Sequence, residues 1–447
     1  MAETPVASVP PNAVPPAPRP RPPQQVSGSG RYVWLSSLRA FGVVLVLLYH
    51  FFPKLCPGGF IGVDIFFVFS GFLITSLLVR EFGTRGHISL ASFYRRRLKR
   101  LLPAVVATLL VTLPLSMLIS EDFRVGIAEQ VAAVLGWTTN FYEIANGQSY
   151  ASQLLPHLYV HTWTLSIEMQ FYLLWGAVLA FAIPAFSLVA RDGRVSTLRA
   201  RKLLLILAWG GGAVSWILMQ VFLIGAEDPS AAYFNTVSHI FPLLIGSAIG
   251  LMAGFPKTRL TQAVGRMNPL VALIICVLAL GGITAIAFLA SFEGHFVWRV
   301  GLLATSLLTA LVIVVGRGMQ TRLRRHRENP ILNYLAERSY SLYLFHWPLF
   351  IIIDHVGIPA PASTVLVPLL ALAATFAASE LSYRFVELPF TSGGKGRTSE
   401  RETRGRTKED ATEERVTEGG RGRVWGGGQK GDGPWGGRAG GGDPGGP

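Results

Sequence analysis

Two ionisable side chains, Arg39 and His50, lie in the first long apolar segment of the chain, residues 33–52. Their separation of eleven residues puts both on one face of a helix, roughly 16 Å apart along its axis. Ionisable groups inside an apolar span are costly and are functional by default. Histidine accepts a proton near neutral pH, so His50 is a candidate base. The alternative is that Arg39 snorkels to one interface and His50 marks the other.

An acidic residue, Asp64, follows in a glycine-rich run at residues 58–72, which opens the second apolar segment. Closely spaced glycines allow helices to approach tightly. A carboxylate near the end of a span can hydrogen-bond a histidine and fix its tautomer. We therefore expect Asp64 to assist a histidine. The alternative assigns the glycines to helix packing and Asp64 to a helix cap.

A dense cationic cluster occupies residues 93–103, directly before the third apolar segment. Arginine pairs with two phosphate oxygens at once, so the cluster is a candidate phosphate site. It fits a plain membrane anchor equally well, because basic residues on the cytoplasmic side of a membrane satisfy topology without any ligand.

Two further apolar segments carry polar side chains at helical spacing. Those of the fourth segment are His161, Thr164, Glu168 and Tyr172, and those of the ninth are Ser339, Tyr343 and His346. An acid and a histidine at that depth should face a polar cavity and not lipid. In the tenth segment, Glu380 and Arg384 are four residues apart and are interpreted as pairing with one another.

The composition indicates which elements must position these residues. Of the 447 residues, 50% are hydrophobic and 15% are charged, whereas a soluble domain carries about a quarter charged residues. A water-soluble enzyme is therefore nearly excluded. The net charge is +14, but basic residues stand in short blocks between apolar runs, which indicates membrane topology and not nucleic-acid binding. Cys56 and Cys276 form neither a disulfide framework nor a zinc-site spacing, so we expect no metal.

Apolar segments of about 20 residues, long enough to span a membrane, follow one another through the chain. We place them at residues 33–52, 60–80, 101–119, 163–184, 203–223, 234–254, 270–290, 298–316, 336–354 and 364–387. They predict an all-α polytopic bundle of about ten transmembrane helices within residues 31–390. The Pro-rich leader at 1–30 and the Gly-rich, mixed-charge tail at 391–447 are predicted to be disordered.

Charge predicts the orientation of these spans. Basic blocks at 80–100, 191–202, 257–266 and 317–327 alternate with loops that carry few Lys or Arg. Ten crossings of the cell membrane with both termini in the cytoplasm place every block inside, as the positive-inside rule asks. A weaker apolar stretch, 127–144, would invert this arrangement if it crossed. We interpret it as re-entrant or interfacial.

In this order, the motifs resemble the acyltransferase-3 family, membrane-bound O-acyltransferases that modify sugars of lipopolysaccharide, cell-wall polymers and some antibiotics. The resemblance covers about residues 31–390. It rests on Arg39 with His50, the glycine run with Asp64, Arg97-x-x-Arg100 with Pro103, Trp163-Thr164-Leu165-Ser166-x-Glu168-x-Gln170-Phe171-Tyr172, and the segment 339–348, which ends in His346-Trp347-Pro348.

The resemblance implies roles for particular residues. It makes His50 and Arg39 the essential pair, Asp64 and Glu168 the site carboxylates, and Arg97 and Arg100 the donor-binding pair. The side chains expected to line the cavity are His161, Tyr172, Tyr343 and His346. Many family members continue into an extracytoplasmic hydrolase-like domain. Residues 391–447 are too few and too Gly-rich for such a domain, so we expect the chemistry to be completed in the membrane body.

The expected reaction moves an acyl group, acetyl by family resemblance, from cytoplasmic acyl-CoA to a hydroxyl of a carbohydrate-containing acceptor: a polysaccharide, a glycolipid or a glycosylated metabolite. The donor-binding pair would hold the phosphates and Arg39 the thioester end, with no tightly bound cofactor. His50, assisted by Asp64 or Glu168, would act as general base or as transient acyl carrier. The alternative function is a transporter or flippase whose intramembrane charges line a translocation path.

Overall fold

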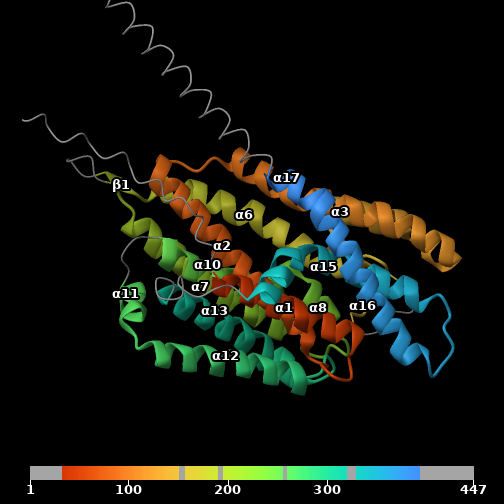
Figure 1. The fold of residues 1–447 in the computed structure, drawn as a ribbon. Helices are drawn as coiled ribbons and strands as arrows, with labels where there is room; N and C mark the ends of the chain where they lie inside the picture. Colours follow the sequence, from red (N-terminus) through yellow and green to blue (C-terminus); the bar gives the residue numbers. More distant parts are fainter. Residues whose placement is uncertain (1–32, 151–156, 190–194, 255–258, 320–328, 393–447) are drawn as a thin grey trace, which may run out of the picture. The chain divides into compact units, whose positions relative to one another are not determined.

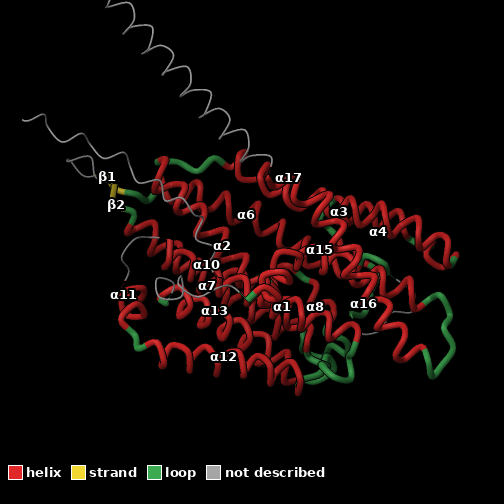
Figure 2. The backbone as a smooth tube through the Cα atoms, viewed as in Figure 1, coloured by secondary structure: helices red, strands yellow, loops and turns green. Residues whose placement is uncertain are grey.

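The structure is a computed structural model that describes residues 33–150, 157–189, 195–254, 259–319 and 329–392. These residues form a helical bundle (Figure 1), which confirms the predicted all-α class. Figure 2 shows how little strand the described chain contains. Strands β1 (Leu188–Val189) and β2 (Val195–Ser196) form one short antiparallel pair. The predicted leader, and all but residues 391–392 of the predicted tail, lie outside the described residues.

Each predicted span overlaps one long helix, although several of these helices extend beyond the predicted bounds. These helices are α1 (Val33–Phe51), α2 (Gly62–Arg85), α3 (Leu90–Ile119), α6 (Trp163–Ala185), α7 (Leu198–Phe222), α10 (Phe241–Gly254), α12 (Pro269–Leu289), α13 (Leu302–Gly318), α15 (Pro330–Asp354) and α16 (Ser363–Ser382). Within the described chain, seven helical segments are long and apolar enough to cross a membrane, and α1 and α10 contribute shorter apolar helices. The chain is therefore a multi-pass membrane protein.

Short helices and turns connect these elements. They are η1 (Gly59–Ile61), η2 (Glu121–Arg124), α4 (Ile127–Leu135), α5 (Thr139–Ala145), η3 (Val160–Thr162), α8 (Ser230–Phe234), α9 (Thr236–His239), α11 (Arg259–Arg266), η4 (Val297–Gly301), η5 (Tyr383–Glu387) and α17 (Leu388–Ser392). Local signals set several helix ends. Asn268 and Asn329 cap α12 and α15 with their side-chain oxygens, each directly before a proline, and Gly86 ends α2 with a φ of 74°.

The weaker apolar stretch, 127–144, is not one spanning helix. It divides into α4 and α5, of 9 and 7 residues, around Trp137, whose φ is +57°. At 1.5 Å per residue, neither helix crosses a hydrocarbon core of about 30 Å. Asn140 on α5 donates to Phe234 O at 3.2 Å and to Thr236 Oγ1 at 2.9 Å, which ties α5 to the turn between α8 and α9.

The predicted span 234–254 is corrected by the structure, because it is interrupted before α10 begins. Asn235 is extended, and its side chain accepts a hydrogen bond from Val237 N at 2.9 Å. Ser238 Oγ donates to Ala232 O, and His239 Nδ1 donates to Tyr233 O at 2.8 Å. These side chains bond to backbone groups that a continuous helix would bond internally.

Glycines bring α2 and α10 into close contact, as the glycine-rich run predicted. A Cβ atom on Gly71 would lie 1.9 Å from Leu243 O, and one on Gly246 would lie 2.0 Å from Val68 O. Only a residue without a side chain fits at either position. The close approach fixes α2, which carries several site residues, against α10.

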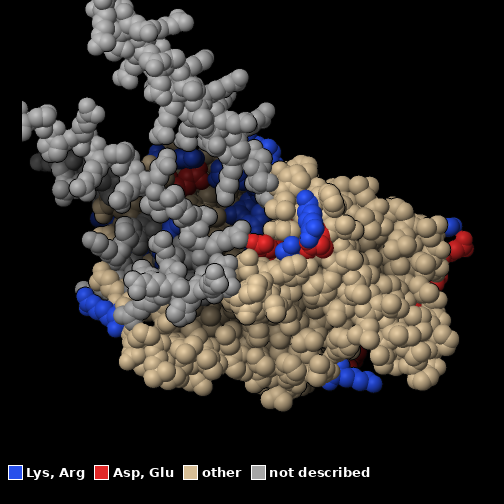
Figure 3. Space-filling view, viewed as in Figure 1, with Lys and Arg blue, Asp and Glu red and all other residues tan. Residues whose placement is uncertain are grey.

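The surface of the described bundle is largely apolar. Most of the face in Figure 3 is uncharged, and large side chains such as Leu118, Phe181 and Leu289 are 82%, 72% and 84% exposed. Lipid contact accounts for such exposure, since water would penalise it. The basic residues 80–100 lie where α2 ends and α3 begins, at the end of the bundle where α1 starts.

Candidate active site

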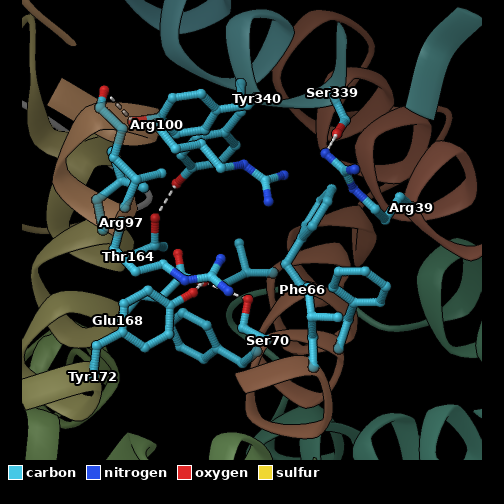
Figure 4. Close-up of a pocket in the computed structure, with 17 residues that line it drawn as sticks. Arg39, Phe66, Ser70, Arg97, Arg100, Thr164, Glu168, Tyr172, Ser339 and Tyr340 are labelled. Carbon is cyan, nitrogen blue, oxygen red and sulfur yellow. Dashed lines mark hydrogen bonds between the residues drawn. The ribbon is translucent and has the colours of Figure 1, made fainter. Parts of the chain in front are cut away.

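A small cavity lies between α1, α2, α3, α6 and α15, with a volume of about 100 Å³. Its polar lining residues are Arg39, Ser70, Arg97, Arg100, Thr164, Glu168, Tyr172, Ser339, Tyr340 and Tyr343. Arg39, Arg97 and Arg100 line it together, although they come from two separate helices (Figure 4). We call it the arginine cavity. An anion is the ligand that this lining favours.

Arg39 lies in the arginine cavity, where it joins α1 to α15. Its Nη2 atom donates to Ser339 Oγ at 2.7 Å, and its guanidinium carbon is 5.7 Å from the centroid of the Phe69 ring. The hydroxyl and the ring orient the guanidinium without neutralising it. Its charge is therefore available to a ligand in the cavity.

Arg97 and Arg100 lie one turn apart on α3. The guanidinium carbon of Arg97 is 5.7 Å from the Phe93 ring centroid and 5.8 Å from that of Tyr172. Within the described chain, no carboxylate forms an ion pair with Arg97 or Arg100. By contrast, Arg96 bonds to Glu81 at 3.2 Å. The two cavity-lining arginines can therefore bind an external anion.

Glu168 lies in the same cavity, beside the arginines. It accepts hydrogen bonds from Ser70 on α2 and from Tyr172, one turn further along α6. Thr164, Glu168 and Tyr172 line the cavity, whereas His161, the fourth member of the predicted polar stripe, lines neither this cavity nor that of His50. The bonds to Glu168 also join α2 to α6 at the cavity wall.

His50 lines a different cavity, at the end of the bundle where α1 stops. This His50 cavity has a volume of about 610 Å³ and includes Tyr49, Tyr150 and Trp347. His50 Nδ1 is 2.9 Å from Val46 O. A carbonyl oxygen only accepts, so Nδ1 carries the proton and Nε2 presents a lone pair. His50 Nε2 is 3.5 Å from the Tyr150 hydroxyl.

Two more buried histidines lie behind His50. The ring centroids of His50 and His346 are 4.8 Å apart, and those of His346 and His161 are 5.4 Å apart. His346 Nδ1 donates to Tyr343 O at 2.6 Å, and His161 Nε2 donates to Leu344 O at 3.1 Å. The other ring nitrogens, His346 Nε2 and His161 Nδ1, have no hydrogen-bond partner among the described residues. Within that part of the chain, no group of three or more His, Cys, Asp or Glu is placed to hold a metal ion.

A hydrogen-bonded pair stands between these histidines and the arginine cavity. Tyr343 OH donates to His161 O at 2.6 Å and lies 2.7 Å from Thr164 Oγ1. Both Thr164 and Tyr343 line the arginine cavity, whereas His50 lines only the other one. The two cavities are thus separated by side chains of α6, α15 and η3.

Neither carboxylate expected to assist His50 is placed to do so, which corrects the expected pairing. Asp64 is fully buried, and its Oδ1 is 3.3 Å from His239 Nε2. Because His239 Nδ1 already donates to Tyr233 O, one proton lies between Nε2 and Asp64. His239 also stacks on Trp163, with ring centroids 5.5 Å apart. Asp64 does bond a histidine, but on the side of α2 that faces α9.

Trp347, in the wall of the His50 cavity, is held by His157 and Glu143, two residues that the sequence did not mark as part of the site. The Trp347 ring centroid is 5.0 Å from that of His50, and its Nε1 donates to His157 O at 3.0 Å. His157 Nδ1 is in turn 2.8 Å from Glu143 Oε2. Burial raises the pKa of Glu143 on α5 above its ordinary value, and the bond from His157 opposes that shift.

Other contributing residues were also missed. Tyr150 lies outside every predicted helix, and no periodic signal marks it. Glu387, which accepts a hydrogen bond from Ser341 on α15, is seven residues after Glu380, and this two-turn spacing was a usable signal. Glu380 itself pairs with Arg384 as predicted, and it also bonds Arg338 of α15.

Comparison with known proteins gives a family match. A family model described as an acyltransferase domain matches residues 32–384. The chain is 32% identical over 367 residues to the peptidoglycan O-acetyltransferase OatA of Listeria monocytogenes, with 80% of this chain and 56% of that protein covered. It is 29% identical over 367 residues to the O-acetyltransferase OatA of Staphylococcus aureus, with 82% and 58% covered. The chain therefore spans less than three fifths of the length of either relative. No solved structure matches it significantly.

Proposed function

Because this chain belongs to the acyltransferase family whose domain model matches residues 32–384, we propose that it transfers an acetyl group from acetyl-CoA to a hydroxyl of a carbohydrate acceptor. The observation that carries the proposal is that two residues of α1, Arg39 and His50, line two different cavities. Arg39 lines a cationic cavity suited to an anionic donor, and His50 lines a second cavity with an available base nitrogen. The acetyl group is suggested by the names of the two relatives.

The donor binds at the arginine cavity. Arg97 and Arg100 hold phosphate oxygens of the CoA, because each presents several donors to an anion and neither is ion-paired within the described chain. Arg39, on the neighbouring helix, orients the thioester end.

The acceptor binds at the His50 cavity. Its aromatic walls, from Tyr49, Tyr150 and Trp347, suit the apolar faces of sugar rings. Lys54 and Asp354 also line it and offer hydrogen bonds to hydroxyl groups. A glycan acceptor agrees with the name of the Listeria relative, a peptidoglycan O-acetyltransferase.

In the direct route, His50 Nε2 takes the proton of the acceptor hydroxyl as its oxygen bonds to the thioester carbonyl carbon. The C–S bond then breaks, and the CoA thiolate takes the proton from His50. In the second route, Nε2 itself attacks the thioester carbonyl carbon, the C–S bond breaks and the CoA thiolate leaves an acetyl-histidine. The acceptor oxygen then bonds to the acetyl carbon, the C–N bond breaks to restore neutral His50, and the hydroxyl proton goes to the thiolate. His161, His346, Tyr343 and Thr164 lie between the two cavities. These side chains separate the cavities, so either route requires them to move aside before the thioester reaches His50.

The orientation follows from charge. Arg97 and Arg100 belong to the basic block at residues 80–100, which the positive-inside rule assigns to the cytoplasm. The donor then enters from the cytoplasm, where acetyl-CoA is made, and the His50 cavity opens on the other side. Both termini are cytoplasmic in this arrangement.

The test is transfer of radiolabelled acetyl from acetyl-CoA by membranes that contain the wild type, His50→Ala or His355→Ala. Label is counted in the extracted glycan, lipid and small-molecule fractions. His355 is exposed and lies outside both cavities, so it is the matched control. We expect label in one fraction for the wild type and His355→Ala, and a loss of at least a hundredfold for His50→Ala. The proposal is contradicted if all three proteins give equal labelling, or if the wild type labels none of the three fractions.

A further inference from the structure

A third cavity, larger than the other two, lies at the same end of the bundle as the His50 cavity. Its volume is about 1090 Å³, which exceeds the roughly 300–1,000 Å³ of typical small-molecule pockets. It lies between the end of α7, the loop at 223–229 and the loop at 290–296, and it includes Trp216 and Trp298. We call it the Trp216 cleft. Neither the donor nor the acceptor hydroxyl of the proposed reaction uses it.

The walls of the Trp216 cleft combine an aromatic surface with carboxylates. Trp216 is half-buried, and its Nε1 atom is buried without a hydrogen-bond partner among the described residues. Glu227, Asp228 and Glu293 are exposed along the cleft, together with Arg299. A sugar ring presents C–H groups to an aromatic face and hydroxyl donors to carboxylates. The cleft therefore offers both kinds of partner to a carbohydrate.

Tyr150 forms the wall between the Trp216 cleft and the His50 cavity. Ser149 lines the cleft, while the next residue, Tyr150, lines the His50 cavity with its hydroxyl 3.5 Å from His50 Nε2. The Phe292 ring, which lines the cleft, is 5.3 Å from the Tyr150 ring. Tyr150 and Phe292 are thus in contact where the two cavities approach one another.

An acid of the cleft also helps to hold that wall. Asp228 Oδ1 accepts a hydrogen bond from Ser230 N at 2.7 Å. Ser230 Oγ in turn accepts one from Tyr150 N, also at 2.7 Å. The loop that lines the cleft and the residue beside His50 are therefore positioned together.

We propose that the Trp216 cleft binds the part of the acceptor glycan next to the sugar that is acylated. The acceptor is then a chain of several sugars, with one ring at His50 and its neighbours against Trp216. Three carboxylates against one arginine favour neutral or amino sugars over polyanionic glycans. This inference rests on the proposed function, because it extends the acceptor site of that reaction.

The test compares acceptors of increasing length: N-acetylglucosamine and its β-1,4-linked dimer, tetramer and hexamer. Transfer from acetyl-CoA is measured with full-length protein in detergent. For the wild type, we expect KM for the acceptor to fall at least tenfold from monomer to tetramer. Trp216→Ala should raise KM for the tetramer about tenfold and leave kcat and the monomer KM unchanged. Trp209→Ala, two turns away on α7 and outside the cleft, is the matched control.

A second variant guards against a folding defect in Trp216→Ala. Glu227→Gln combined with Glu293→Gln changes two exposed side chains, and we expect a severalfold rise in KM for the tetramer only. A wild-type KM that does not depend on chain length overturns the inference, as does a Trp216→Ala profile equal to that of Trp209→Ala in a folded protein.

A binding measurement separates this inference from the proposed function. Tetramer binding to the wild type and to Trp216→Ala is measured by calorimetry without acetyl-CoA. If the tetramer binds in a manner that depends on Trp216 but the protein transfers no acetyl group, glycan binding in the cleft is supported and the proposed function is contradicted. Transfer without any dependence on Trp216 or chain length keeps the proposed function and removes the cleft.

Discussion

Arg39 and His50 both contact α15, yet they line separate cavities. Arg39 donates to Ser339 in the first half of α15, and His50 packs against His346 two turns later. The hydrogen-bonded pair of Thr164 and Tyr343 lies between the two. Helix α15 thus contacts both the cationic cavity and the candidate base. The predictions below follow from this arrangement.

Removing either cavity-lining arginine of α3 should weaken donor binding. A hydrogen bond to a charged group contributes about 1.5–3 kcal/mol, so Arg97→Ala or Arg100→Ala should raise KM for acetyl-CoA about 10- to 100-fold. Because the reacting groups remain, kcat should change only severalfold. Steady-state transfer of radiolabelled acetyl measures both constants. Arg95→Ala, an exposed arginine outside the cavity, should behave as wild type.

Asp64→Asn should affect stability more than chemistry, because Asp64 bonds His239 and not His50. Loss of a buried, charge-assisted bond costs about 1–3 kcal/mol, which predicts a lower melting temperature in detergent. The protein that stays folded should keep the wild-type KM for acetyl-CoA and most of kcat. A large fall in kcat at unchanged melting temperature would instead make Asp64 a partner of His50.

Gly71→Ala should destabilise the bundle. The added Cβ would meet Leu243 O at 1.9 Å, so α2 and α10 must separate. Overpacking of this kind costs about 1–3 kcal/mol. Gly83→Ala lies on the same helix with no atom within 4 Å of its Cβ, and it should be neutral or slightly stabilising. Thermal unfolding in detergent compares the two variants, and equal melting temperatures would contradict the packing argument.

Glu143→Gln should change how stability depends on pH. Burial raises the pKa of Glu143 above its ordinary value of 4.5. The unfolded chain therefore loses this proton at lower pH than the folded protein, and wild-type stability falls as pH rises from 4.5 toward the folded-state pKa. The glutamine of the variant does not titrate, so the variant does not lose stability in this way. The difference in melting temperature, variant minus wild type, should therefore grow as the pH rises from 4.5 toward the folded-state pKa of Glu143. Glu129→Gln, an exposed acid on α4, should show no such trend.

The membrane spans were predictable because length and apolarity act locally. A run of about 20 apolar residues must form a helix in lipid whatever its neighbours are, since every backbone group needs an internal partner. The prediction failed where polar side chains compete with the backbone. Asn235 and His239 interrupt the expected span at 234–254 by bonding to nearby backbone groups.

The sequence by itself determined that this protein is an all-α membrane protein, and that Arg39 and His50 share one face of a helix. Both properties follow from composition and from the fixed helical period. Only the tertiary structure decided the partners: it joined Asp64 to His239, set Glu168 beside Ser70 and Tyr172, and divided the site into two cavities. Helical period states which residues share a face, but the packing of one helix against another decides what that face meets.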